Sequence, residues 1–274
     1  MNPTITLNSN CYHSFTIEDA IAGALKAGYK SIELTATKSW TEHVFTDQPI
    51  RKLWQVKDTL EQAQLIPIAL SGHTNIMDPD RISDFIANMR LANFFQTKYV
   101  VTSVGEAHMK DSVTISDKAI ANRLCELIPY LERFGLILVI ENHGEHATGS
   151  RIHSIIREVN HPLVKINFDT ANGIFYAGKD PVEDLEECVD EVGYIHLKDK
   201  IDGQGVWNFP ALGKGAVNIP EIFRVLKNAH NLSPISVEIE FTSSGAKDLH
   251  EVDQAVVDSM NYLHSIIDFD GGNG

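Results

Sequence analysis

LILVIENHG, at residues 136–144, is the first of four apolar runs that each end in a residue able to bind a metal ion, in this case Glu141. The other runs are VKINFDTAN (164–172) with Asp169, VGYIHLKDK (192–200) with His196, and PISVEIEF (234–241) with Glu238. The four residues follow one another at intervals of 28, 27 and 42 positions, with a helical pattern between each pair. This alternation is typical of strand–helix units in a parallel barrel. Because the carboxyl ends of barrel strands meet at one mouth, we expect the four side chains to converge there.

Eight strand candidates alternate with eight helix candidates along the chain. The strands are predicted at residues 4–8, 31–35, 66–71, 98–103, 136–141, 164–169, 192–197 and 235–240. Most are short apolar runs, as expected for strands that are buried on both faces. The sequence therefore predicts an α/β fold, a single-domain (β/α)8 TIM barrel over residues 1–268, followed by a flexible, glycine-rich tail at 269–274.

Capping signals and apolar stripes support the helices between these strands. Thr16, Asp180 and Asn218 each stand where a helix N-cap is expected, and each is followed three residues later by an acidic residue. Pro181 directly after Asp180 suits the first position of a helix. Apolar residues recur at steps of three and four within 120–134 and 252–267, so these helices would lay one stripe against the barrel.

Composition narrows the class of protein. The 274 residues include 23 Lys and Arg against 37 Asp and Glu, a formal charge of −14, which disfavours binding to a nucleic-acid backbone. Three scattered cysteines argue against a disulfide framework and for a reducing compartment. The start MNPTITLNSN has no signal-peptide character, and no apolar run approaches the roughly 20 residues that span a bilayer. We expect a cytoplasmic protein with neither nucleic-acid nor membrane partners.

The four strand-end residues form an oxygen-rich ligand set. Three carboxylates and one imidazole suit one divalent ion, with Mn²⁺ preferred and Mg²⁺, Co²⁺ or Zn²⁺ as alternatives. Each residue also has a structural interpretation, since Asp169 could cap the following turn and His196 could be a hydrogen-bonded core histidine. The recurrence of such residues at four consecutive strand ends favours the metal site.

Two glutamates in this set indicate a type of reaction. Isomerising or epimerising a sugar removes a proton beside a carbonyl and returns one, through an ene-diolate that a divalent ion can stabilise. Two carboxylates on opposite sides of the substrate can act in turn as base and acid. Glu141 and Glu238, on the fifth and eighth predicted strands, are therefore the candidate catalytic pair, and a small carbohydrate is the expected substrate.

Further polar and aromatic residues near the strand ends are candidates for substrate binding. They are His73, His143, Glu145, Asn172, Lys198 and Trp207. For most of them a structural role competes: a local hydrogen bond for His73, a solvated loop for His143 and Glu145, an ion pair with Asp199 for Lys198, and a loop anchor for Trp207. The run at 213–215 (GKG) is interpreted as a turn rather than a phosphate cradle, and Glu33 as a structural strand-end contact.

The order VIENHG, NFDTAN, YIHLKDK, SVEIEF resembles the xylose isomerase-like TIM barrel superfamily, also called the sugar phosphate isomerase/epimerase family. Its members include D-tagatose 3-epimerase, hydroxypyruvate isomerase, inosose dehydratase and endonuclease IV. The resemblance runs from SIEL at 31–34 to the Glu238 strand. It implies that Glu141, Asp169, His196 and Glu238 bind the metal and that the two glutamates exchange protons. It also allows a homo-oligomer, since relatives commonly form dimers or tetramers.

Two positions depart from subfamily patterns. Ketohexose 3-epimerases have a histidine where this chain has Asn172 and an arginine where it has Asp202. Endonuclease IV needs the same histidine and a later Asp-x-His, which IDGQGVWNFP at 201–210 lacks. These departures argue against both assignments, and against a three-zinc nuclease most strongly.

Two rival functions stay open at the level of sequence. One is a lyase on the same metal site, which would dehydrate a keto-inositol or eliminate the aglycone of a keto-glycoside with help from His143 or Lys198. The other is a barrel that binds a sugar without turning it over.

Overall fold

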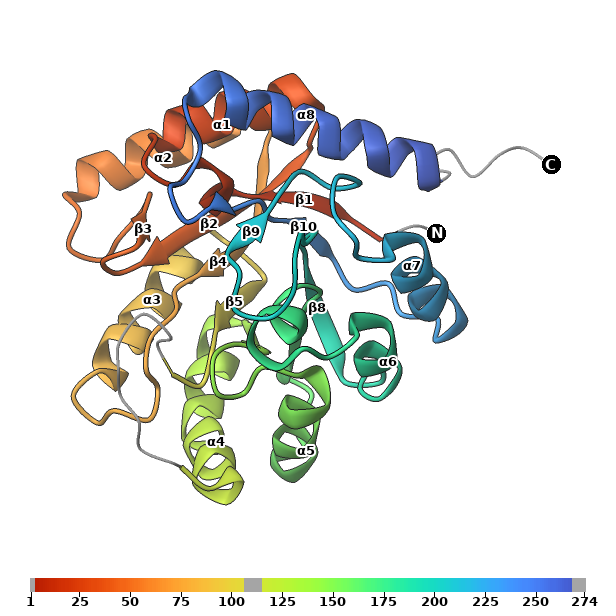
Figure 1. Ribbon diagram of the computed structural model, residues 1–274. Helices are drawn as coiled ribbons and strands as arrows, with labels where there is room; N and C mark the ends of the chain where they lie inside the picture. Colours follow the sequence, from red (N-terminus) through yellow and green to blue (C-terminus); the bar gives the residue numbers. More distant parts are fainter. Residues whose placement is uncertain (1–2, 106–114, 268–274) are drawn as a thin grey trace.

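Eight parallel strands close into a barrel in the computed structural model, which describes residues 3–105 and 115–267 (Figure 1). They are β1 (Ile5–Asn8), β2 (Ser31–Thr37), β4 (Ile66–Ser71), β5 (Tyr99–Thr102), β6 (Ile137–Glu141), β7 (Val164–Asp169), β8 (Val192–Leu197) and β10 (Ile235–Val237). Each strand pairs with the next in this order, and β1 pairs with both β2 and β10, which closes the barrel. The predicted single-domain (β/α)8 fold is confirmed; the predicted tail at 269–274 lies outside the described residues.

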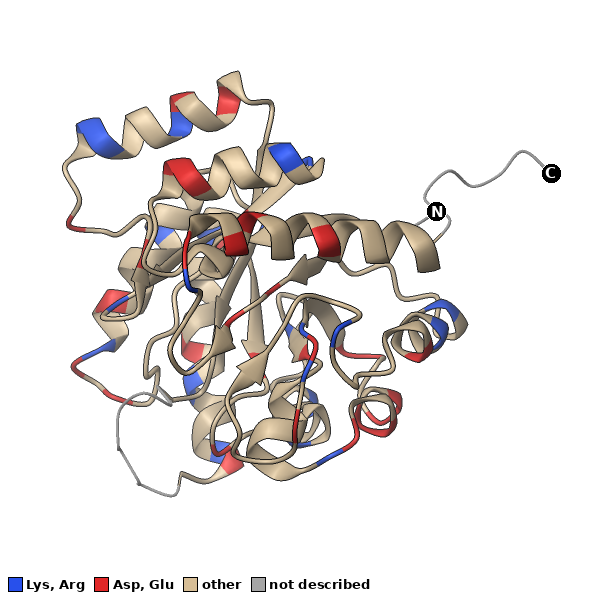
Figure 2. Cartoon of the chain, turned by 45° about the horizontal axis from the view of Figure 1, so that its top comes forward, with Lys and Arg blue, Asp and Glu red and all other residues tan. Residues whose placement is uncertain are grey.

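Eight α-helices surround the strands (Figure 1). They are α1 (Ile17–Ala27), α2 (Ile50–Gln62), α3 (Ile82–Phe94), α4 (Asp117–Phe134), α5 (Gly149–Val159), α6 (Pro181–Glu186), α7 (Ile219–Asn228) and α8 (Leu249–Ile266). A 3₁₀-helix, η1 (Ser9–Tyr12), follows β1, and one turn of π-helix, η2 (Gly173–Ala177), follows β7. Figure 2 shows Lys and Arg interspersed with Asp and Glu along the helices. Within the described ranges, no helix has the length and hydropathy needed to cross a bilayer.

The predicted caps form as hydrogen bonds. Thr16 accepts from the amide of Asp19 in a full capping box, Asp180 accepts from two amides at the start of α6, and Asn218 accepts from the amide of Glu221. These bonds satisfy amides that have no partner inside the helix. The starts of α1, α6 and α7 are therefore specified locally, whereas α2 and α3 begin without a side-chain cap.

Side chains two residues before each metal-ligand candidate face the barrel interior, because strand side chains alternate. Val139 precedes Glu141 in this way and Tyr194 precedes His196; both are fully buried and pack with Ala69 and Val101 in a small cluster separate from the main strand–helix core. The interior is thus packed below the mouth, and the four metal-ligand candidates lie above this layer.

The described residues also form three two-residue strands that were not among the eight strands predicted from the sequence. β3 (Thr41–Glu42) pairs antiparallel with the end of β2, and β9 (Asn208–Phe209) pairs antiparallel with β11 (Phe241–Thr242). The predicted strand at 235–240 was too long, since β10 ends at Val237. Beyond it the chain leaves the barrel and bonds to the loop after β8, where the amide of Glu240 donates to the carbonyl of Phe209 at 3.2 Å.

Candidate metal and substrate site

Glu141, Asp169, His196 and Glu238 converge at the mouth, as the sequence predicted. Each stands within one residue of the end of its strand, each is buried, and one ligand atom from each lies within 4.8 Å of the others. Two ligands of one ion with bonds of roughly 2.0–2.2 Å lie at most about 4.4 Å apart. The largest separation within the cluster is close to this limit, so the four residues are candidates for binding one ion.

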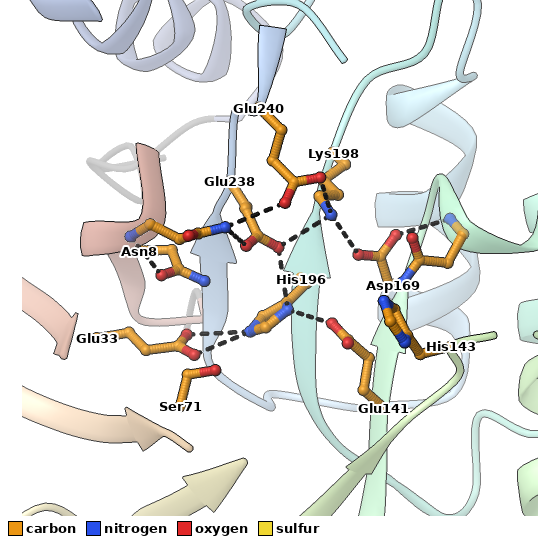
Figure 3. A network of polar contacts seen from close by, with 12 residues as sticks. Asn8, Glu33, Ser71, Glu141, His143, Asp169, His196, Lys198, Glu238 and Glu240 are labelled. Carbon is orange, nitrogen blue, oxygen red and sulfur yellow. Dashed lines mark hydrogen bonds and ion pairs between the residues drawn. The ribbon is translucent and has the colours of Figure 1, made fainter. Parts of the chain in front are cut away.

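His196 is held between carboxylates on both sides of its ring (Figure 3). Its Nδ1 lies 2.6 Å from Glu141 Oε1 and 3.2 Å from Glu238 Oε2, so this nitrogen faces the ligand cluster. Its Nε2 lies 3.0 and 3.1 Å from the two oxygens of Glu33. Burial lowers the pKa of His196, but Glu33, Glu238 and Glu141 outweigh it and hold the pKa well above its usual value. The sequence interpretation of Glu33 as a structural strand-end contact fits this position. The residue that Glu33 contacts is His196, one of the four candidate metal ligands.

The two carboxylate oxygens of Asp169 have different roles: one caps a turn of the backbone, and the other faces the metal-ligand cluster. Oδ1 accepts from the amides of Ala171 and Asn172, both at 2.8 Å, so the aspartate does cap the turn after β7. Oδ2 is buried without a hydrogen bond and lies 3.3 Å from the Lys198 ammonium. Burial raises the pKa of Asp169 to about 7 despite this ammonium. A buried carboxylate oxygen directed at the cluster is what a cation ligand requires.

The two glutamates are held in matching ways. Each directs one oxygen toward His196 and offers the other to a neutral or cationic donor: Glu141 Oε2 lies 2.8 Å from His73 Nε2, and Glu238 Oε1 accepts from Asn10 Nδ2 at 2.9 Å. Burial opposes ionisation of both. For Glu141 the imidazoles of His73 and His196 hold the pKa well below its usual value, and for Glu238 Lys198 and His196 lower it to about 2.

Lys198 is buried among carboxylates rather than paired with Asp199. Its ammonium lies 2.9 Å from Glu240 and 3.3 Å from both Asp169 and Glu238. Burial lowers its pKa, but these carboxylates outweigh burial and hold the pKa well above its usual range. The cation offsets part of the negative charge at the mouth.

Asp199 has a separate structural role. Its carboxylate accepts from backbone amides of the loop after β8, those of Gly213 at 2.9 Å, Gly215 at 2.8 Å and Val217 at 3.1 Å. The GKG run is therefore a turn wrapped around a side chain, as the sequence favoured. A Cβ on Gly215 would lie 2.2 Å from this carboxylate, so only glycine fits there.

A cavity of about 200 Å³ opens above the cluster. Five of the six predicted substrate-binding residues line it: His73, His143, Asn172, Lys198 and Trp207. The sixth, Glu145, is exposed on the loop after β6 and is not among the lining residues. The side-chain nitrogen of Asn172, Nδ2, donates to the backbone carbonyl of Asn142, so Asn172 also has a structural role.

Other lining residues were not singled out from the sequence. Asn10, Trp40, Phe175, Tyr176 and Glu240 all border the cavity. Glu240 had a readable signal, because it follows Glu238 by two residues and so shares its face of an extended chain. The others lie in the 3₁₀-helix η1, in the turn after β2 or in the π-helical turn η2, which are too short for a periodic pattern to mark the direction of a side chain.

Fold and site together define a (β/α)8 barrel with a buried cluster of three carboxylates and one imidazole, which could hold a cation, at the carboxyl ends of its strands. The family model for the xylose isomerase-like TIM barrel matches residues 21–266. The chain therefore belongs to this family, and the resemblance drawn from its strand-end motifs is confirmed.

Solved structures of low sequence identity share the fold. D-allulose 3-epimerase from Methylomonas sp. is 17% identical with a TM-score of 0.76, over 97% of this chain and 98% of that chain. The IOLI protein with a bound zinc atom is 19% identical with a TM-score of 0.75, over 97% and 100%. The 3-keto-D-glucoside 4-epimerase from E. coli is 15% identical with a TM-score of 0.72, over 96% and 100%. A search of curated proteins found no match.

Proposed function

We propose that this protein is a divalent-metal-dependent isomerase or epimerase of a sugar, keto-sugar or sugar derivative. The observation that carries the proposal is the convergence of Glu141, Asp169, His196 and Glu238 at one buried point of the mouth. Family membership supports it, because structural neighbours are named as epimerases of D-allulose and of a 3-keto-D-glucoside.

The same four residues would hold one divalent ion. Their hard oxygen donors favour Mn²⁺, with Mg²⁺, Co²⁺ and Zn²⁺ as alternatives, and the zinc atom in the structure of the IOLI protein, which shares this fold, supports a metal here. When bound, such an ion acts as a Lewis acid that polarises a carbonyl oxygen.

Glu141 and Glu238 supply the proton transfers in this proposal. Their low pKa values keep both carboxylates ionised at neutral pH, so either can remove a proton from the carbon beside the carbonyl. The glutamate that has taken the proton is then the acid that returns one. Return to a neighbouring carbon gives isomerisation, while epimerisation at one carbon needs the second glutamate on the opposite face.

Lys198 and His73 would orient the substrate and the bases. The Lys198 ammonium borders the cavity beside Glu238 and can stabilise negative charge that develops on a substrate oxygen. His73 fixes the outer oxygen of Glu141, so the base keeps one orientation.

Incubation in D₂O tests the proposal. A panel of ketoses, keto-inositols and keto-glycosides is treated with protein and Mn²⁺, quenched with chelator and analysed by mass spectrometry. A gain of one deuterium that is absent in Glu141→Gln and Glu238→Gln, and present in the exposed control Glu132→Gln, is the expected result. Loss of water or of an aglycone would instead assign a lyase, and full exchange in both glutamine variants would refute the two-glutamate mechanism.

A further inference from the structure

A second cavity, of about 380 Å³, adjoins the one above the metal-ligand cluster. Asn10, Trp40, Trp207 and Glu240 line both cavities, so these side chains stand at their shared boundary. Figure 3 shows Glu240 beyond Glu238, on the side away from His196. The second cavity extends from this boundary between the loop after β1 and the segment 239–246 after β10.

A series of aromatic rings runs from the first cavity to the second. Phe175 packs edge-on against Trp207 at 5.6 Å between ring centroids, and Trp207 lies 6.1 Å from Trp40. Trp40 is in turn stacked on His13, at 4.4 Å and an interplanar angle of 20°. The rings hold one another in place while remaining partly exposed, and such aromatic walls suit a ligand with both apolar faces and polar edges.

The other side of the second cavity is polar but almost uncharged. Ser14, Thr242, Ser243 and Ser244 line it with hydroxyl groups, which can both donate and accept hydrogen bonds. Among the described lining residues Glu240 brings the only carboxylate, and none is Lys or Arg; the lysines that line the adjoining cavity are Lys38 and Lys198, and Lys198 already pairs with Glu240. In the second cavity a phosphate or carboxylate would therefore have no Lys or Arg among the described lining residues to pair with, whereas neutral hydroxyl groups would have partners.

Two clusters of backbone amides around the mouth are already filled by the protein's own carboxylates. Asp184 accepts from the amides of Gly149 and Ser150 at the start of α5, and Asp199 accepts from three amides in the loop at 213–217. In parallel barrels such helix starts and late loops commonly bind phosphate. Here both clusters are occupied, which again favours an uncharged ligand.

The volumes indicate a ligand larger than one sugar ring. Sites for small molecules usually measure about 300–1,000 Å³, a range that the metal cavity alone does not reach and that the two cavities together do. We infer that the substrate is a neutral glycosylated keto-sugar, whose keto ring lies above the metal cluster and whose second ring lies in the aromatic cavity bounded by Trp40 and Trp207. This inference rests on the proposed function, since it assigns the substrate class of that site.

Calorimetric titration of the Mn²⁺-loaded protein tests whether a second sugar ring contributes to binding. The probes are D-fructose and four neutral glucosyl-fructoses that differ only in linkage: turanose, maltulose, leucrose and isomaltulose. At least one disaccharide should bind about tenfold or more tightly than fructose, a difference of about 1.4 kcal/mol. Equal or weaker binding of all four disaccharides would overturn the inference.

Two variants locate the second ring. Ser243→Trp and Ser244→Trp place an indole on exposed residues that line the second cavity only, and each should reduce the disaccharide-to-fructose affinity ratio by about tenfold or more. Ser154→Trp, exposed on α5, is the matched control and should keep the ratio. A ratio that survives both cavity variants would place the second ring elsewhere and refute the assignment.

The same probes in D₂O separate this inference from the proposed function. Exchange into fructose and the disaccharides without any affinity preference would retain the proposed reaction and remove the second-ring site. A preference abolished by the tryptophan variants, without deuterium exchange into any probe, would retain the site and count against the proposed reaction.

Discussion

Replacing Glu33 with glutamine should weaken metal binding although Glu33 is outside the predicted ligand set. The fully buried carboxylate of Glu33 contacts His196 Nε2 at 3.0 and 3.1 Å and so favours a proton on Nε2. A cation that displaces the Nδ1 proton would then find the Nδ1 lone pair directed at the cluster. Glutamine can still accept this hydrogen bond but carries no charge.

The size of the effect follows from that single bond. A hydrogen bond to a charged group is worth about 1.5–3 kcal/mol and a neutral one about 0.5–1.5, so the substitution removes on the order of 1–1.5 kcal/mol. That corresponds to a dissociation constant for Mn²⁺ raised about tenfold, at the lower end of the roughly 10–100-fold losses seen when partners of metal-binding histidines are replaced.

Calorimetric titration of Mn²⁺ into chelator-stripped protein measures this constant directly. Glu42→Gln, an exposed glutamate on β3, is the control and should bind as the wild type does. Circular dichroism checks that the variant is folded. An unchanged dissociation constant in folded Glu33→Gln would show that Glu33 supports the barrel without orienting the ligand.

Two further predictions concern stability. Burial lowers the pKa of His43 to about 4, below its usual 6.5, so the unfolded chain binds more protons and the free energy of unfolding should fall by about 3 kcal/mol as the pH drops from about 6.5 to 4. Urea denaturation of the wild type and His43→Gln across this range should show a smaller decrease in the variant, and parallel curves would contradict the assignment. Asp199→Asn leaves one side-chain oxygen for several amide donors and should cost about 2–3 kcal/mol, with faster proteolysis of the loop at 200–217; wild-type values in both measurements would count against this role.

The barrel and the convergence of the four metal-ligand candidates could be predicted from the sequence because both depend on local signals. Apolar runs mark buried parallel strands, and a polar residue that ends each run can only lie at the mouth. Glu141, Asp169 and His196 are the last or next-to-last residues of their strands, so the strand boundary also fixed their position. The capping residues were equally local, since each bonds to amides two or three residues away.

Contacts across the barrel could not be predicted from such local signals, because they join residues that are far apart in the sequence. Glu33 meets His196 from a strand 163 positions earlier, and Asn10 reaches Glu238 across 228. The structural alternative considered for Lys198, an ion pair with its neighbour Asp199, is not what the structure shows: Asp199 accepts from backbone amides, and the lysine pairs with Glu240. Trp40 carries no periodic signal at all, because its direction depends on the irregular loop after β2.

The pairing that closes the barrel also sets an order for events during synthesis. β1 pairs in register with β10, Ile5 with Ile235, so the first strand made cannot find its second neighbour until nearly all the described chain exists. At about 5–20 residues per second this wait is on the order of ten seconds or more, during which β1 presents an unpaired edge to other nascent chains. The four metal-ligand candidates lie at or beside the ends of adjacent strands, β6, β7, β8 and β10, which are synthesised after the other barrel strands. The candidate cation site and the barrel seam are therefore completed by the same later segment of the barrel.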